Sequence, residues 1–188
     1  MSNYCCNPLL GIGKSTVMSF PKILPVYRRS SITMVRGQGS CLYDDAGKRY
    51  LDFAIGIGVN TLGHGHPSIV EALKKQADKL WHCSNLYQHE GLNQLAATLT
   101  EHSFADTVFF CSTGTEAVEC AVKMARRYHQ ISTQKRYRVI TFEGGFHGRS
   151  FLGISAGGND TAKAGYLPLL QGFDQVPFND ILAVKQAI

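Results

Sequence analysis

The sequence lacks the marks of secreted, membrane-spanning and zinc-binding proteins. Its six cysteines include no Cys-x-x-Cys pair, so we predict free thiols and neither a disulfide framework nor a metal site. No apolar run approaches the roughly 20 residues that a membrane-spanning helix needs. The first residues have neither the charged start nor the long apolar stretch of a secretory leader. We therefore expect a cytoplasmic protein with no membrane partner.

Acidic residues are also scarce, with 14 Asp and Glu against 19 Lys and Arg, which gives a net charge of +5. Between residues 126 and 138 there are five cations and no acid: Arg126, Arg127, Lys135, Arg136 and Arg138. The first two fall near the end of an expected helix, where the helix dipole favours cations. This explanation is simpler than a nucleic-acid surface, so we predict no nucleic-acid partner.

The composition is that of a globular protein. The 188 residues are 44% apolar and 18% charged, which is enough to bury a core. Glycine is abundant, with 19 residues often clustered in short runs, as is typical of tight loops close to a ligand. No internal repeat or low-complexity tract is present.

Beyond an N-terminal arm over residues 1–22, amphipathic helices alternate with short apolar segments. The spacing of apolar residues predicts helices over 68–80, 90–102 and 116–129. Strands are expected over 33–36, 41–44, 49–53, 107–111, 138–142 and 173–176, and a further helix over 181–188. This order predicts an α/β fold with a mainly parallel sheet and flanking helices.

The most informative passage is residues 108–117, VFFCSTGTEA. An apolar segment leads into a small polar turn, and the turn opens a helix. Free backbone N–H groups at the positive end of a helix dipole form a natural phosphate or carboxylate site. Thr113 and Glu116 also have capping-box spacing, so an ordinary helix start explains the pattern about equally well.

A second passage, residues 143–150 (EGGFHGRS), directly follows the expected strand 138–142. Ligands of α/β proteins bind beyond the carboxyl ends of strands. Phe146 could stack on a flat ring, and Arg149 could bind a carboxylate through two parallel hydrogen bonds. Taken singly, a core aromatic residue and a surface ion pair are the commoner explanations.

Together these passages resemble class III aminotransferases of fold type I and, within them, the acetylornithine aminotransferase group. The resemblance begins near Pro25 and continues to the last residue. Its ordered motifs are VRGQG (35–39), YLDF (50–53), GVNTLGHGHP (58–67), KLWHCSNLY (79–87), FADTVFF (104–110) and FHGR (146–149).

The resemblance implies the fold and the domains. It implies the N-terminal part of a fold-type I pyridoxal-phosphate-dependent transferase, incomplete in this chain. Residues 1–62 would form the N-terminal arm and small-domain strands, and residues 63–188 the first part of the large cofactor-binding domain.

The resemblance also implies the site and the reaction. Gly114 and Thr115 would bind the phosphate of pyridoxal 5'-phosphate, Phe146 would stack on its ring, and Arg149 would hold the substrate's α-carboxylate. The expected reaction transfers an amino group between N2-acetylornithine and 2-oxoglutarate in arginine biosynthesis, in a homodimer. Ornithine, succinylornithine and 4-aminobutyrate aminotransferases are alternatives of the same family.

Members of this family are longer than this chain, and we expect the Schiff-base lysine in the part that it lacks. Lys163 has a superficially similar context, but it follows Arg149 too closely, and its neighbours suggest a surface loop. No catalytic residue is therefore assigned. The chain alone is expected not to complete multiple turnovers, and a shortened, non-catalytic gene product is the alternative from another class.

Two further patterns are weak. Residues 11–15, GIGKS, end like a phosphate-binding P-loop, but the pattern requires a glycine where Pro8 stands. His64 and His66 could be two metal ligands. Because only two appear and Pro67 opens a helix behind them, we favour a structural role in the loop.

Overall fold

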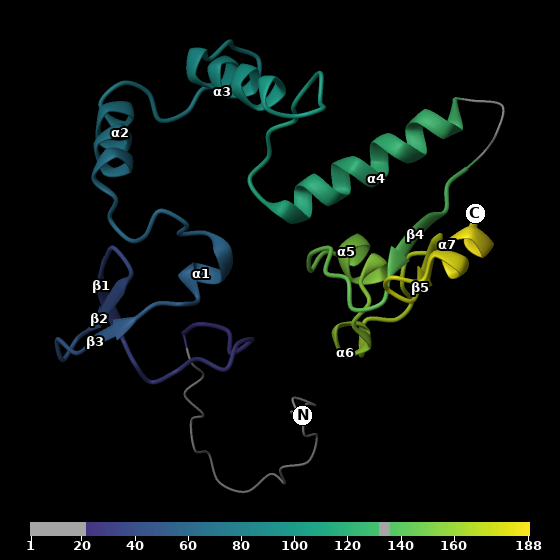
Figure 1. Cartoon of the computed structure of the whole chain (residues 1–188), viewed down its shortest axis with the longest axis horizontal. Coiled ribbons are helices and arrows are strands. Elements are labelled where there is room, and N and C mark those ends of the chain that lie inside the picture. The colour runs from purple at the N-terminus through teal and green to yellow at the C-terminus, as the bar shows by residue number, and fades with distance from the viewer. Residues whose placement is uncertain (1–21, 132–135) are drawn as a thin grey trace, which may run out of the picture. The chain divides into compact units, whose positions relative to one another are not determined.

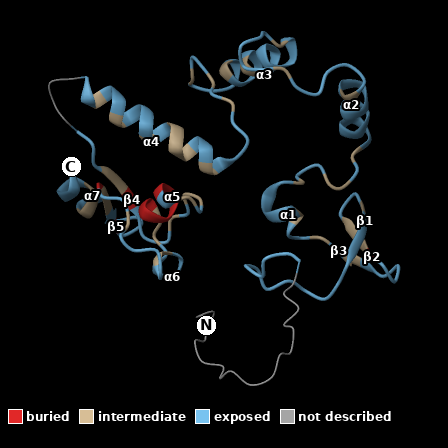
Figure 2. Cartoon of the chain, turned by 180° about the vertical axis from the view of Figure 1, so that it is seen from behind, coloured by how far each residue is buried: buried red, intermediate tan, exposed pale blue. Residues whose placement is uncertain are grey.

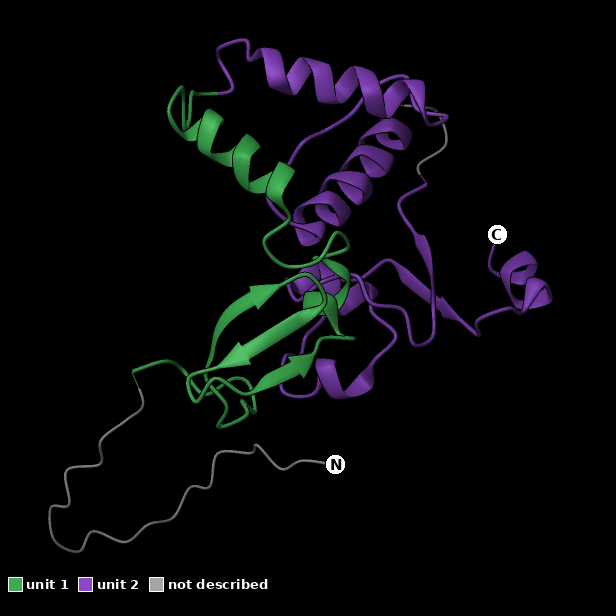
Figure 3. Ribbon diagram, turned by 60° about the vertical axis from the view of Figure 1, so that its left-hand side comes forward, with its two compact units in different colours: residues 1–84 green, residues 85–188 purple. Residues whose placement is uncertain are grey.

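The computed structural model describes residues 22–131 and 136–188, which form two compact units (Figures 1 and 3). The first unit extends to Ser84, and the second runs from Asn85 to Ile188. Nearly all of the predicted N-terminal arm, and the GIGKS segment within it, lie outside the described residues. Within the described part, no helix is both long and apolar enough to cross a membrane.

The first unit contains a three-stranded antiparallel meander. Its strands are β1 (Met34–Gln38), β2 (Cys41–Asp44) and β3 (Arg49–Leu51), in the order β1-β2-β3. All three were predicted from sequence, and their ends differ from the predicted bounds by at most two residues.

Asp44, at the end of β2, organises the turn into β3. It is only 8% exposed, and its Oδ1 accepts the amide hydrogens of Ala46 (3.0 Å) and Lys48 (2.8 Å). Its Oδ2 accepts the hydroxyl of Tyr50 at 2.8 Å. These bonds, above all the one from Tyr50, hold the pKa of Asp44 below its ordinary value.

Asp52 plays the same part in the glycine-rich loop that follows β3. Its Oδ1 accepts the amides of Ala54 (3.0 Å) and Ile55 (2.9 Å) at the start of α1 (Ile55–Gly58). Its Oδ2 lies 2.7 Å from Nε2 of His64 at the far end of the loop. The contact with His64 is the main reason that the pKa of Asp52 lies below its ordinary value.

The two loop histidines therefore take part in separate local arrangements. His64 contacts Asp52, and His66 is the N-cap residue of α2 (Pro67–Ala77). Among the described residues, no three His, Cys, Asp or Glu side chains are grouped so that they could hold a metal ion.

The second unit combines helices with a two-stranded parallel sheet, in which Val139 pairs with Phe173 and Phe142 with Val176. Its elements are α3 (Glu90–Glu101), α4 (Gly114–Gln130), β4 (Val139–Phe142), α5 (Phe151–Ala156), α6 (Asp160–Lys163), β5 (Phe173–Val176) and α7 (Ile181–Ala187).

The most deeply buried part of the second unit is α5 (Figure 2). Leu152, Ile154 and Ala156 are buried there, together with Val176 of β5. The sequence analysis missed this helix, because six residues are too few to show a helical period. Its formation depends on burial and on the N-cap residue Ser150, whose hydroxyl accepts the amide of Gly153 at 3.1 Å.

Two local predictions were wrong. Residues 107–111 are not a strand, because none of the described residues supplies a neighbouring strand to pair with their backbone. The segment around Lys163 is not an irregular surface loop: it contains the short helix α6, and the Lys163 side chain is only 17% exposed.

The Asp44 turn leads to a prediction about pH. A carboxylate whose folded pKa is lowered adds stability above the unfolded pKa, and this contribution is lost as pH falls through the folded value. In the Tyr50→Phe variant, the pKa of Asp44 should rise toward its ordinary value. An NMR titration of the Asp44 carboxyl carbon between about pH 6 and 2 measures this directly.

The stability difference between Tyr50→Phe and the unaltered chain should be largest near neutral pH and should shrink in acid. Tyr43→Phe, on the adjacent strand, is the matched control and should leave the Asp44 titration in place. An unchanged Asp44 midpoint in Tyr50→Phe would contradict the assignment.

Candidate functional site

The start of α4 is capped by its own side chains. Oγ1 of Thr113 accepts the amide of Glu116 at 3.2 Å. The Glu116 carboxylate in turn accepts the amide of Ser112 (2.8 Å) and the hydroxyl of Thr113 (3.3 Å). The capping interpretation is therefore correct, and it accounts for the amides of Ser112 and Glu116.

The capping leaves the amides of Gly114 and Thr115 for an anion, because the first N–H groups of a helix have no intrahelical acceptor. A Cβ atom placed on Gly114 would meet nothing within 4 Å, so the space beside the helix start is open. The positive end of the dipole of this 17-residue helix lies at the same residues.

The loop after β4 is held by a close approach between two backbone segments. The amide of Gly144 donates to the carbonyl of Gly158 at 3.3 Å, and the amide of Gly158 donates to the carbonyl of Gly145 at 2.9 Å. A Cβ atom on Gly158 would lie 2.2 Å from the nitrogen of Gly144. Only glycine fits there, so the beginning of the loop has little freedom.

Farther along, the loop touches the start of α4. Gly148 has a φ of +107°, and a Cβ atom placed on it would lie 2.5 Å from Oγ1 of Thr115. Two residues later, the hydroxyl of Ser150 donates to Oε1 of Glu119 at 2.7 Å. These contacts bring together the two passages that the sequence analysis singled out.

The same loop lines a cavity of about 650 Å³. Phe146 is 76% exposed, and Cζ of Arg149 lies 6.0 Å from the centre of its ring. Both residues line the cavity, whereas Gly114 and Thr115 do not. Thr115 contacts Gly148, and Gly148 lines the cavity. The arrangement offers a ring face and a guanidinium beside one opening.

His147 also lines this cavity. Its Nε2 atom is buried and has no hydrogen-bond partner among the described residues. Such an atom is costly unless a ligand or water satisfies it.

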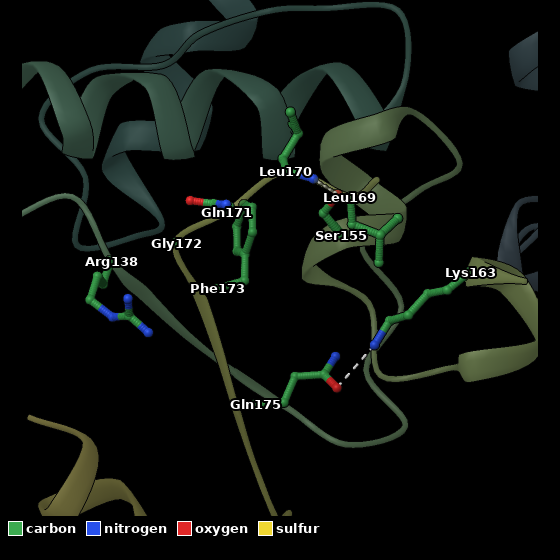
Figure 4. A pocket seen from close by; sticks show the side chains of 9 residues that line it. All are labelled: Arg138, Ser155, Lys163, Leu169, Leu170, Gln171, Gly172, Phe173 and Gln175. Atoms are coloured by element: carbon green, nitrogen blue, oxygen red, sulfur yellow. Dashed lines mark hydrogen bonds between the residues drawn. The ribbon is translucent and has the colours of Figure 1, made fainter. Parts of the chain in front are cut away.

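Lys163 lines a different cavity, of about 450 Å³, together with Gln175 (Figure 4), whereas Thr161 and Ala162 of the same helix line the Phe146 cavity. Its Nζ lies 3.1 Å from Oε1 of Gln175 and 3.4 Å from Oδ1 of Asp160. The described residues that line the Phe146 cavity include no lysine.

The sequence analysis missed several residues of this region. Asn159, Thr161 and Tyr166 line the cavity from the segment around α6, and no sequence signal pointed to them because α6 itself was not recognised. Glu119 and Ser150 were also missed as a pair. The spacing of Glu119, four residues after Thr115, was the one available indication.

Comparisons with known proteins identify the family of this chain. The class-III aminotransferase model matches residues 25–187. The acetylornithine aminotransferase of Agrobacterium fabrum is 51% identical over 167 residues, which are 88% of this chain and 42% of that protein. The chain thus spans less than half the length of the curated relatives that it matches.

Solved structures are similar over the same range. The ornithine aminotransferase of Toxoplasma gondii is 25% identical, with a TM-score of 0.82 over 88% of this chain and 40% of that one. An amine transaminase from an uncultivated Pseudomonas species, solved with pyridoxal phosphate bound, is 30% identical, with a TM-score of 0.75 over 85% and 39%. With fold, motifs and relatives in agreement, this chain belongs to the class-III aminotransferase family.

Proposed function

We propose that this chain supplies the phosphate cradle, the ring face and the carboxylate-binding arginine of a pyridoxal-phosphate-dependent aminotransferase. The contact between Thr115 and Gly148 carries this proposal. It sets an anion-binding helix start beside a cavity lined by Phe146 and Arg149. A phosphorylated ring that carries an amino acid presents a phosphate, a ring and a carboxylate in the same order.

The residues present fit the cofactor. The amides of Gly114 and Thr115 suit a phosphate, and the exposed face of Phe146 suits the pyridine ring. When bound, pyridoxal phosphate supplies an electron sink for bonds at the α-carbon of an amino acid. The residues of this chain bind the phosphate, orient the ring and place the substrate.

Arg149 accounts for the substrate class. Amino acids and 2-oxo acids share a carboxylate, so one guanidinium can hold both partners of an amino transfer through two parallel hydrogen bonds. Because the relatives at about 50% identity are named acetylornithine aminotransferases, N2-acetylornithine and 2-oxoglutarate are the proposed pair, with a role in arginine biosynthesis. The cytoplasmic homodimer stays a prediction.

These residues alone bind the cofactor without a covalent bond. Lys163, whose Nζ contacts Gln175 and Asp160, faces a separate cavity. No lysine lines the Phe146 cavity among the described residues. We therefore propose binding by this chain but no sustained turnover.

The cofactor proposal predicts the effect of Phe146→Ala. The unaltered chain should bind pyridoxal phosphate, seen as a change in the absorbance of the cofactor on titration. Loss of the stacked ring should weaken binding by about fivefold to tenfold, equivalent to roughly 1 kcal/mol. Phe104→Ala, which removes a fully exposed ring elsewhere in the second unit, is the control. Equal losses in both variants would contradict the assignment.

The activity proposal predicts the behaviour of a chimera. In it, this chain replaces the matching segment of the Agrobacterium fabrum acetylornithine aminotransferase. We expect the chimera to form glutamate steadily from N2-acetylornithine and 2-oxoglutarate, and the 188-residue chain alone to form none. Faster turnover with ornithine or 4-aminobutyrate would reassign the substrate, and steady turnover by the chain alone would refute the binding-only role.

The substrate proposal predicts the effect of Arg149→Ala in the same chimera. Loss of the two-point carboxylate contact should raise KM for both N2-acetylornithine and 2-oxoglutarate by about 100-fold, equivalent to roughly 3 kcal/mol. Arg136→Ala, an exposed arginine of the same unit, should leave both KM values near those of the parent chimera. Unchanged KM values in Arg149→Ala would rule out carboxylate binding by this residue.

A further inference from the structure

Two consecutive turns of α4 meet the loop that carries the site. Thr115 and Glu119 are four residues apart on the helix, so they lie on one face about 6 Å from each other. Gly148 and Ser150, the loop residues that they contact, are two apart in the loop. The loop is therefore held against the helix at two points.

The second contact is a hydrogen bond from the Ser150 hydroxyl, which acts as both donor and acceptor. Oγ of Ser150 donates to Oε1 of Glu119 at 2.7 Å and accepts the amide of Gly153 at 3.1 Å. The carbonyl of Ser150 also accepts the amide of Ile154 at 2.9 Å. A carboxylate acceptor makes the bond to Glu119 stronger than one between neutral groups. Ser150 is thereby tied to α4 and to α5 at once.

Arg149 lies between these two contacts. Its neighbours on both sides, Gly148 and Ser150, are held against α4, while Arg149 lines the cavity. Rotation of this segment would move the guanidinium away from the ring face of Phe146. The position of Arg149 thus depends on the bond between Ser150 and Glu119, neither of which lines the cavity.

We propose that Glu119 is a positioning residue, which through Ser150 aligns the 148–150 segment and so places Arg149 and Phe146 over the start of α4. The effect of Glu119 on ligand binding rests on the proposed function. The alignment of the 148–150 segment by Glu119 does not depend on that function. Because Ser150 also accepts the amides of Gly153 and Ile154 at the start of α5, loosening of Ser150 in a Glu119 variant should be visible as faster opening of these two bonds.

Amide hydrogen exchange in the chain without ligand tests the alignment. In Glu119→Ala, exchange at Gly153 and Ile154, whose acceptors both belong to Ser150, should be about tenfold faster. Exchange at Val139, whose amide is bonded to the carbonyl of Gly172 in the same unit, should stay unchanged. No acceleration, or equal acceleration at Val139, would overturn the proposal, because the second result would show a general loss of stability.

A conservative variant and a matched control sharpen this test. Glu119→Gln keeps an oxygen that accepts the Ser150 hydroxyl and should exchange within about threefold of the unaltered chain. Glu101→Ala removes an exposed glutamate of α3 and should have no effect at Gly153 or Ile154. Failure of Glu119→Gln to restore slow exchange would overturn the hydrogen bond as the cause.

Ligand titrations test the consequence for the site. Glu119→Ala should bind pyridoxal phosphate about tenfold more weakly and inorganic phosphate with unchanged affinity, because the start of α4 is intact. Equal weakening for both ligands, or for neither, would overturn the positioning role. No binding of pyridoxal phosphate by the unaltered chain would refute the proposed function, and the exchange rates would still decide whether Glu119 aligns the loop.

Discussion

The candidate site depends on one close approach, that of the loop backbone at Gly148 to the side chain of Thr115. No side chain fits between them, since a Cβ atom at Gly148 would lie 2.5 Å from the Thr115 hydroxyl oxygen. The approach joins the start of α4, the proposed anion site, to a cavity with a ring face and a guanidinium. Without it, the two passages would be separate loop features, each with an ordinary structural explanation.

The capping and anion-binding interpretations of α4 do not compete, because they use different amides. The capping box takes the amides of Ser112 and Glu116, a contribution of about 1 kcal/mol to the helix start. The amides of Gly114 and Thr115 are left. The cap therefore fixes the turn whose free amides would bind a phosphate. The structural role of Thr113 is compatible with the proposed phosphate-binding role of Gly114 and Thr115.

Elements whose apolar residues recur at a clear helical or strand spacing could be predicted from sequence. Elements that depend on a partner distant in the sequence could not. The helices α3 and α4 and the strands β4 and β5 lie where apolar spacing placed them. Residues 107–111 have the composition of a strand but no pairing partner among the described residues. The helix α5 has little local signal and forms through burial. The same limit hid the bond between Glu119 and Ser150, which are 31 residues apart.

The Phe146 cavity and the cavity that holds Lys163 have different linings. The Phe146 cavity offers a cation for a carboxylate, a ring face and an unpartnered buried histidine nitrogen. Lys163, at the end of α6, contacts Gln175 in the other cavity. The proposed recognition of a phosphate, a ring and a carboxylate needs only fixed donors and a ring face. Proton movement at the α-carbon needs a mobile base within hydrogen-bond reach of it, and no lysine among the described lining residues of the Phe146 cavity provides one.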